Sequence, residues 1–297
     1  ECRQGEKPFI LRITHSSHRT VETIIAELEW IEYLALHGIS TPRPIRSIHG
    51  KHVEVVDARS SYFLVTGFLK IPGQSIIQAN ACTPELYREW GRLVGRMHAL
   101  SKDYAPSSNL YQRPTWFEND LVVNATRYLA SQEAILQRSR KLMRYLYALP
   151  QDRNSFGLIH TDLTDVNFFV HDGEIIVFDF DDSEYHWLVY DIAVILFDTL
   201  RWLPHDGMNG REFGSYFWTQ FAQGYLQENR LDAYWIKQLP RFFKLREMLL
   251  YIFFHKKWDF DHLNEQQQEL LCQYKHNIEY DIPYLDIDFL STIDKYS

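Results

Sequence analysis

The hydrophobic pattern of this chain changes near residue 70, and the change limits the folds that the chain can adopt. Before that point, alternating apolar residues predict strands at 9–13, 52–56 and 62–68. The segment 21–36 instead has apolar residues spaced every three or four positions, and Thr20 is suited to cap the helix that this spacing predicts. The first 70 residues therefore predict a small sheet with one helix against it.

From residue 71 onward the pattern is mainly helical and rich in aromatic residues. Thr83 followed by Pro84 is typical of a helix N-terminus. Helical spacing also covers 119–149 and most of the chain after residue 190, and a block of short strand-like runs at 155–182 lies between them. We therefore expect an α+β bilobal fold, with an N-lobe at 1–70 and a mainly helical C-lobe at 71–297.

Composition limits the partners of the chain. The formal charge of -8 makes nucleic acid and anionic membranes unexpected partners. The three cysteines are far apart in the sequence, which argues against a disulfide framework or a cysteine-rich zinc site and favours a cytoplasmic protein. The most apolar stretch, 187–200, contains Asp191 and Asp198 and is shorter than the roughly 20 residues that cross a bilayer.

A predicted hairpin brings three polar side chains together. Asp172-Gly173 is a strong two-residue turn signal between two strand-like runs. Such a turn pairs positions whose numbers sum to 345, so Asn167 and Asp179 leave the open end of the hairpin side by side. Asp162 lies five residues before Asn167 on a loop that can reach them.

These three side chains fit phosphoryl transfer. Amide and carboxylate oxygens are ligands suited to Mg²⁺, which takes its remaining ligands from water and substrate phosphates. A second carboxylate nearby can accept the proton of an attacking hydroxyl group. The alternative is that these residues are only the polar ends of a surface hairpin, but the right residue type at all three positions favours the catalytic interpretation.

The motif His160-x-Asp162-x-x-x-x-Asn167, followed by Phe178-Asp179, resembles the catalytic and metal loops of the aminoglycoside phosphotransferase and choline kinase group. More narrowly, it is similar to small-molecule kinases related to homoserine kinase type II and stress-response kinases. The resemblance extends from about residue 8 to 202 and includes the segments ILRIT, AELEWIEYL, GRLVGRMHALS and FDFDDSEYHWLVYDIA.

The resemblance implies a protein-kinase-like fold, with its catalytic and metal loops at 158–191, and an activity that uses ATP and Mg²⁺. It implies that Asp162 is the catalytic base and that Asn167 and Asp179 are Mg²⁺ ligands. His160 and Asp191 would brace the catalytic loop. On residue chemistry alone, His160 would be read as a core histidine, which differs little from a brace.

The resemblance also implies a nucleotide site at the connector between the lobes, at Phe68, Leu69 and Lys70. Where this fold has a phosphate-binding lysine on a strand, the sequence offers Arg12. Glu27 lies on or beside the apolar face of the predicted helix, so it needs a partner, and Arg12 is the natural one. The alternative is an exposed arginine and a glutamate that reaches solvent.

The sequence departs from the family pattern in two further respects. No glycine-rich loop precedes the first strand, so we expect either that N-terminal residues, including that loop and the first strand, are missing or that nucleotide is bound differently. Thr161 stands where related kinases most often have glycine, and a β-branched residue restricts the backbone there.

The residues after the metal carboxylate suggest the acceptor. Carboxylates at Asp181, Asp182 and Glu184, with the aromatic ring of Trp187, predict a pocket rim that favours a cation. We therefore expect a small amine-bearing alcohol, such as an amino alcohol, a hydroxylated amino acid or an aminoglycoside. The alternative for the aromatic residues is that they fill the core.

Two other functions remain open from the sequence. A protein kinase is disfavoured because no Ala-Pro-Glu segment is present and Asp191 follows Asp179 by 12 residues, which leaves little room for a peptide platform. A catalytically silent binding protein of the same fold would explain Arg12 and the missing loop. The presence of Asp162, Asn167 and Asp179 together argues against it.

Overall fold

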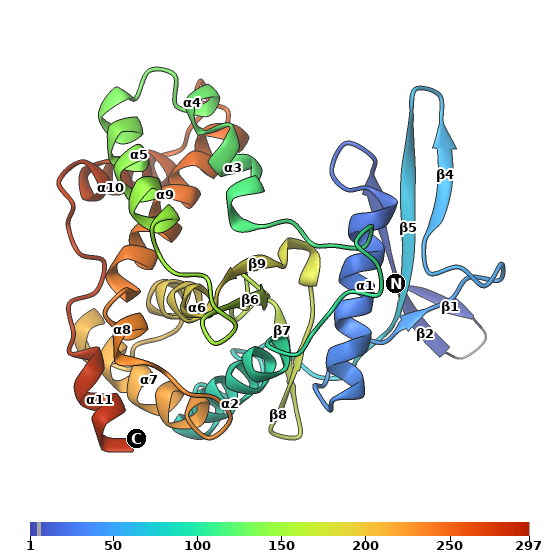
Figure 1. The fold of residues 1–297 in the computed structure, drawn as a ribbon, viewed down its shortest axis with the longest axis horizontal. Helices are drawn as coiled ribbons and strands as arrows, with labels where there is room; N and C mark the ends of the chain where they lie inside the picture. The colour runs from blue at the N-terminus through green and yellow to red at the C-terminus, as the bar shows by residue number, and fades with distance from the viewer. Residues whose placement is uncertain (5–6, 297) are drawn as a thin grey trace.

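The computed structural model describes residues 1–4 and 7–296, which form a sheet-containing part and a larger helical part (Figure 1). The sheet and helix α1 (Val21–Leu36) lie on one side, and most of the other helices lie on the opposite side. The segment between α2 (Pro84–Ser101) and η1 (Trp116–Glu118) runs back past α1 before the chain enters the helical part. The two parts are therefore connected by more than the chain between β5 (Ser61–Leu69) and α2.

The sheet is antiparallel, with strand order β1-β2-β5-β3, and β4 also pairs with β5. The predicted strand at 9–13 lies within β2, the one at 62–68 lies within β5, and the one at 52–56 is shifted to β4. The strand bounds are β1 Cys2–Gln4, β2 Lys7–His15, β3 Pro44–Ile45, β4 Glu54–Ala58 and β5 Ser61–Leu69.

Helix α1 (Val21–Leu36) has the predicted bounds and the predicted cap. The Thr20 hydroxyl accepts a hydrogen bond from the backbone of Thr23, and the Thr23 hydroxyl accepts one from the backbone of Thr20. This capping box satisfies donors that would otherwise be unpaired at the helix N-terminus. The buried face of α1 contains Glu27 among apolar residues, and this placement brings the carboxylate toward the sheet.

The helical part contains one long predicted helix that the structure breaks. The segment 119–149 forms α3, α4 and α5. The side chain of Asn119 caps the start of α3, α3 ends with Asn124 as its C-cap, and α4 ends with Leu129 as its C-cap before α5 begins at Glu133. The bounds are α2 Pro84–Ser101, η1 Trp116–Glu118, α3 Asp120–Val123, α4 Ala125–Tyr128, α5 Glu133–Tyr147, α6 Leu188–Trp202, α7 Gly210–Tyr225, α8 Ala233–Ile236, α9 Leu239–Lys257, α10 Glu265–Glu279 and α11 Phe289–Tyr296.

Helices α2 and α7 cross at van der Waals distance because each has a glycine at the crossing. A Cβ at Gly91 would lie 1.9 Å from the carbonyl oxygen of Phe221, and one at Gly224 would lie 1.8 Å from that of Arg88. A side chain at either position would therefore push the helices apart. The crossing anchors α2, whose residues support the catalytic loop.

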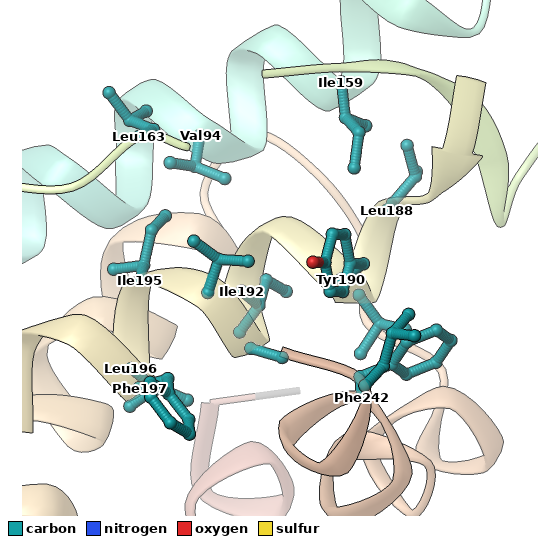
Figure 2. Packing of buried hydrophobic residues seen from close by; sticks show 14 of the residues in the cluster. Val94, Ile159, Leu163, Leu188, Tyr190, Ile192, Ile195, Leu196, Phe197 and Phe242 are labelled. Atoms are coloured by element: carbon teal, nitrogen blue, oxygen red, sulfur yellow. The ribbon is translucent and has the colours of Figure 1, made fainter. Parts of the chain in front are cut away.

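Helix α6 is the centre of the core. Nearly every residue from Leu188 to Thr199 is buried, and its side chains pack against α2 and α9. Figure 2 shows Ile192 and Ile195 on α6 beside Val94 of α2, with Phe242 of α9 close to Tyr190. Because α6 and α9 are fixed by this packing, polar side chains that leave them are held in defined positions.

Two short antiparallel pairs carry the functional loops. Strand β6 (Phe156–Ile159) pairs with β9 (Glu184–Trp187), and β7 (Phe168–His171) pairs with β8 (Glu174–Val177). The 3-10 turn η2 (Phe180–Asp182) connects the second pair to β9. The loop that carries His160 and Asp162 follows β6, and the loop that carries Asp179 follows β8.

We propose that the two lobes divide at residue 70, because β5 ends at Leu69 and the next helix begins at Pro84.

Among the described residues, no helix has both the length and the apolar composition needed to cross a membrane.

Candidate active site

The β7–β8 hairpin has the register that the sequence predicts. Phe168 pairs with Val177, and the backbone N–H of Phe178 donates to the carbonyl oxygen of Asn167 at 3.0 Å. Asn167 and Asp179 therefore leave the hairpin side by side. Asp179 is exposed and has a left-handed backbone, with φ of 64°. Its carboxylate accepts no hydrogen bond from the described residues, which leaves both oxygens available to a ligand.

Asp162 lies against the same end of the hairpin. The amide nitrogen of Asn167 donates to Asp162 Oδ2 at 2.9 Å and to its backbone carbonyl at 2.8 Å. Burial raises the pKa of Asp162, and the positive charge of Arg246 acts in the opposite direction. Asp162 and Asn167 are therefore in contact, Asp179 leaves the same end of the hairpin, and the chemical roles of all three remain predictions.

The carboxylate of Asp191, on α6, accepts hydrogen bonds from the backbone of the loop that carries Asp162. One carboxylate oxygen accepts from the N–H of Thr161 at 2.6 Å, and the other accepts from the N–H of His160 at 3.1 Å. The second oxygen also accepts from Nε2 of the buried His98, whose Nδ1 lies 2.9 Å from the hydroxyl of Tyr225. This chain of buried hydrogen bonds fixes Asp191 and, through it, the loop.

His160 itself connects the two loops. Its Nε2 donates to the carbonyl of Phe178 at 3.1 Å, and its Nδ1 accepts from the N–H of Asp162 at 3.3 Å. Thr161 has φ of 66°, a conformation that costs a β-branched residue energy. Its hydroxyl donates to the carbonyl of Asp182 at 2.7 Å, which helps to hold this conformation.

The predicted pair of Arg12 and Glu27 is present. The two terminal nitrogens of Arg12 lie 2.7 Å and 2.5 Å from the two carboxylate oxygens of Glu27, which is fully buried. The guanidinium also lies over the ring of Phe68, 5.4 Å from its centroid. Arg12 is therefore held at the position that the sequence predicts for a phosphate-binding cation, and its contact with nucleotide stays a prediction.

We expect the effects of Arg12→Gln and Glu27→Gln on ATP affinity to be non-additive. Each change breaks the same bidentate pair, so a double-mutant cycle should show a coupling of about 0.5 kcal/mol or more. Titration of ATP into the two single variants, the double variant and the parent measures it. Additive effects would mean that the pair does not position Arg12 for the nucleotide.

The other predicted nucleotide residues lie at the end of β5. Phe68 is partly buried and packs against the core, while Leu69 is exposed. The ammonium of Lys70 lies 2.7 Å from the carboxylate of Glu1, in a surface pair. Only Phe68 of these three contacts Arg12 directly, and we retain all three as proposed nucleotide contacts.

The residues predicted to form the acceptor rim differ in their contacts and exposure. Both carboxylate oxygens of Asp181 pair with Arg19, and Asp182 pairs with the same guanidinium at 2.7 Å. The ring of Trp187 is fully buried, and its N–H donates to the carbonyl of Pro150. Trp187 therefore fills the core, and the prediction that it rims an acceptor pocket is wrong. Asp181 is paired with Arg19 in this structure, and its contact with a cationic substrate stays a prediction.

Glu184 differs from these residues. It is 5% exposed, and the amide nitrogen of Asn119 donates to one of its oxygens at 3.3 Å. Among the described residues, no cation lies within ion-pair distance of it. Burial raises the pKa of Glu184 to about 8. Glu184 pairs with Ile159 across strands β9 and β6, so it lies close to the start of the catalytic loop.

Two arginines that the sequence interpretation missed connect the parts of the site. Arg19 lies between β2 and α1 and reaches Asp181 and Asp182 after the metal loop. Arg113 is 3% exposed and donates to the carbonyls of Thr23, Asp181 and Ser183. The sequence carries no local signal for these contacts, because their partners lie at least 68 positions away.

A third missed arginine, Arg246 on α9, contacts Asp162 and Asp198. A signal for Asp198 was present in the sequence, since a carboxylate in the apolar segment 187–200 needs a buried partner.

The donor set fits a Mg²⁺ ion that is shared with phosphate. No group of three or more His, Cys, Asp or Glu side chains that could hold a metal ion occurs among the described residues. One amide and one carboxylate, at Asn167 and Asp179, leave most of an octahedral shell for water and phosphate oxygens, which is how Mg²⁺ is usually bound in such sites.

Comparison with known proteins gives one similarity over nearly the whole chain and others over part of it. Residues 2–244 match the profile described as the phosphotransferase enzyme family. Amicoumacin kinase from Bacillus subtilis (strain 168) is 35% identical over 296 residues, covering 99% of this chain and 87% of that protein. Homoserine kinase from Granulibacter bethesdensis is 30% identical over 176 residues, covering 57% of this chain and 53% of that protein.

Solved structures agree with these similarities. The amicoumacin kinase hAmiN, in complex with AMP-PNP, Ca²⁺ and Ami, has a TM-score of 0.91 at 35% identity and covers 96% of this chain and 85% of its own. A microcompartment-associated aminopropanol kinase has a TM-score of 0.74 at 21% identity and covers 93% of this chain and 85% of its own. At this identity the similarity shows the fold alone. The predicted α+β bilobal, protein-kinase-like fold is confirmed.

Proposed function

Because this chain belongs to the phosphotransferase enzyme family and is an ATP-dependent small-molecule kinase, we propose that it phosphorylates a hydroxyl group of an amine-bearing molecule. The observation that carries the chemistry is the convergence of Asp162, Asn167 and Asp179 at one end of the β7–β8 hairpin. The similarity to amicoumacin kinase over nearly the whole chain favours this activity over a protein kinase or a silent binding protein.

In the proposed reaction, Asp162 accepts the hydroxyl proton as the acceptor oxygen bonds to the terminal phosphorus of ATP, while the bond from that phosphorus to the bridging oxygen breaks and ADP leaves. Arg12, held by Glu27, contacts the phosphates. Asn167 and Asp179 would hold Mg²⁺, which when bound neutralises charge on the phosphate oxygens. His160, Thr161 and Asp191 keep the loop that carries Asp162 in place, so the base is positioned before substrate arrives.

The amine is supported by Glu184. A buried carboxylate without a cation is costly to ionise, and an ammonium group would supply the missing charge. Its neighbours Ile159 and Asn119 place it beside the strand that leads to Asp162. A relative is named for homoserine, an amino acid with a hydroxyl group.

The activity is tested by ADP production with a panel of alcohols, with and without Mg²⁺. The panel contains amicoumacin, homoserine and 1-amino-2-propanol, together with 1,2-propanediol as the uncharged analogue of the last. We expect Mg²⁺-dependent turnover with at least one amine-bearing member and little with the diol. Preference for uncharged alcohols would contradict the amine proposal while leaving the kinase activity in place.

Glu184→Gln should raise KM for the amine acceptor about tenfold or more, because a buried charged contact is lost. In the parent, KM should fall as pH rises toward 8, since an ammonium group requires ionised Glu184 and the free carboxyl is protonated below its raised pKa. The Glu184→Gln variant should lose this pH dependence. Initial rates from pH 6 to 8 measure both effects, and an unchanged KM for the variant would contradict the assignment.

A further inference from the structure

A guanidinium group lies between Asp162 and a second buried carboxylate. Nη2 of Arg246 lies 2.9 Å from Asp162 Oδ1 and 2.7 Å from Asp198 Oδ2, and Nε lies 3.1 Å from the same Asp198 oxygen. Arg246 and Asp198 are both largely buried, with 15% and 7% of their side chains exposed. One arginine therefore contacts the proposed base and an anchor at the same time.

The anchor is rigid because it belongs to the core. Asp198 leaves α6 and Arg246 leaves α9, two helices that pack against each other in the centre of the helical part. Nε and Nη2 of Arg246 both donate to the same oxygen of Asp198, Oδ2, and two donors on one edge of the guanidinium restrict its plane. Nη2 carries two N–H groups, so it can donate to Asp198 and also to Asp162, which lies on a loop.

Both oxygens of Asp162 thus have a donor. Arg246 donates to Oδ1, and the amide of Asn167 donates to Oδ2 at 2.9 Å. Each carboxylate oxygen has a second lone pair, so a substrate hydroxyl can still approach. With two donors from different elements, the carboxylate cannot rotate freely, and a displacement of about 1 Å can cost on the order of 100-fold in rate.

We propose that Arg246, anchored by Asp198, is a positioning residue that holds Asp162 in the orientation needed for proton transfer. This inference rests on the proposed function, because it assumes that Asp162 is the base. The competing interpretation is that Arg246 only stabilises the contact between α6 and α9. Buried ion pairs are weak evidence for a contribution to stability, so the two interpretations must be separated by kinetics.

The first experiment compares Arg246→Gln and Arg246→Lys with Arg241→Gln, a control on the exposed side of α9. We expect Arg246→Gln to lower kcat about 10- to 100-fold while KM for ATP stays within about twofold. Arg246→Lys should recover part of the rate, since an ammonium can contact one carboxylate but not hold both with a planar fork. Arg241→Gln should leave kcat and KM unchanged.

Rates are expressed per folded molecule, with thermal unfolding measured for every variant. An unchanged kcat in both Arg246 variants, with or without a lower unfolding temperature, would overturn the proposal. Equal losses of kcat in Arg246→Gln and Arg246→Lys would also overturn it, as would a change in KM for ATP with kcat unchanged. If Arg246→Gln does not fold, Arg246→Lys and Asp198→Asn supply the same comparison, and a kcat loss in each with KM for ATP retained is expected.

The second experiment separates this inference from the proposed function. Arg246→Gln is measured in the Asp162→Asn background, where no base remains to be positioned. We expect the second change to have little further effect on kcat, whereas additive losses would show that Arg246 acts independently of Asp162. Full activity of Asp162→Asn alone would instead overturn the base assignment.

Discussion

Replacing Asp162 by asparagine is expected to lower kcat about 1,000-fold and to leave the affinity for ATP within a fewfold of the parent. The side chain keeps its shape, and the amide oxygen can still accept from Arg246 or Asn167. The group that accepts the hydroxyl proton is lost, while Arg12, Asn167 and Asp179 are unchanged. Steady-state rates at saturating ATP and acceptor, together with ATP titration, measure the two quantities separately.

Asp165→Asn is the matched control, since it removes a partly buried carboxylate from the same loop, three residues later. It should keep near-parental turnover. If Asp162→Asn turns over like this control, Asp162 is not the base. A loss of ATP affinity equal to the loss of kcat would place Asp162 at the nucleotide instead of at the acceptor.

Local patterns in the sequence were sufficient for the elements that carry the proposed chemistry. The spacing of apolar residues and Thr20 predicted α1 with its observed bounds, and Asp172-Gly173 predicted the register that places Asn167 beside Asp179. Both are short-range effects, in which a cap or a turn residue fixes the geometry of its own neighbours. The contact of Arg12 with Glu27 could also be predicted, because a buried carboxylate needs a cation and Arg12 stands on the strand where the resembling fold has a lysine.

The contacts that could not be predicted join distant segments. Arg246 lies 84 positions from Asp162, and Arg19 lies 162 positions from Asp181. Charged residues are common on surfaces, so their sequence positions alone do not indicate which pairs meet. Trp187 shows the same limit for aromatic residues, because a ring near a predicted site can equally fill the core. The division of 119–149 into three helices was also not predicted, although Asn119, whose side chain caps α3, belongs to a residue type that favours helix ends.

Asp179→Asn is expected to abolish most of the Mg²⁺-dependent gain in ATP affinity, a loss of about 100-fold or more. The carboxylate supplies the negative charge at this end of the hairpin, and an amide oxygen is a much weaker ligand for a divalent ion. Asn167→Ala should weaken the gain less, because it removes a neutral ligand. It should lower kcat as well, since Asn167 also holds Asp162. ATP titrations with and without Mg²⁺ measure the gain in each variant.

Asp172→Asn supplies a close control for this prediction because the two aspartates occupy opposite ends of the same hairpin in the same kind of backbone conformation. The φ angle is 64° at Asp179 and 50° at Asp172, and asparagine tolerates this left-handed region as well as aspartate does. Any effect of the substitution on backbone strain or net charge is therefore shared by the two variants. A loss of Mg²⁺ dependence confined to Asp179→Asn would assign the ion to the open end of the hairpin, whereas equal Mg²⁺ dependence in both variants would exclude Asp179 as its ligand.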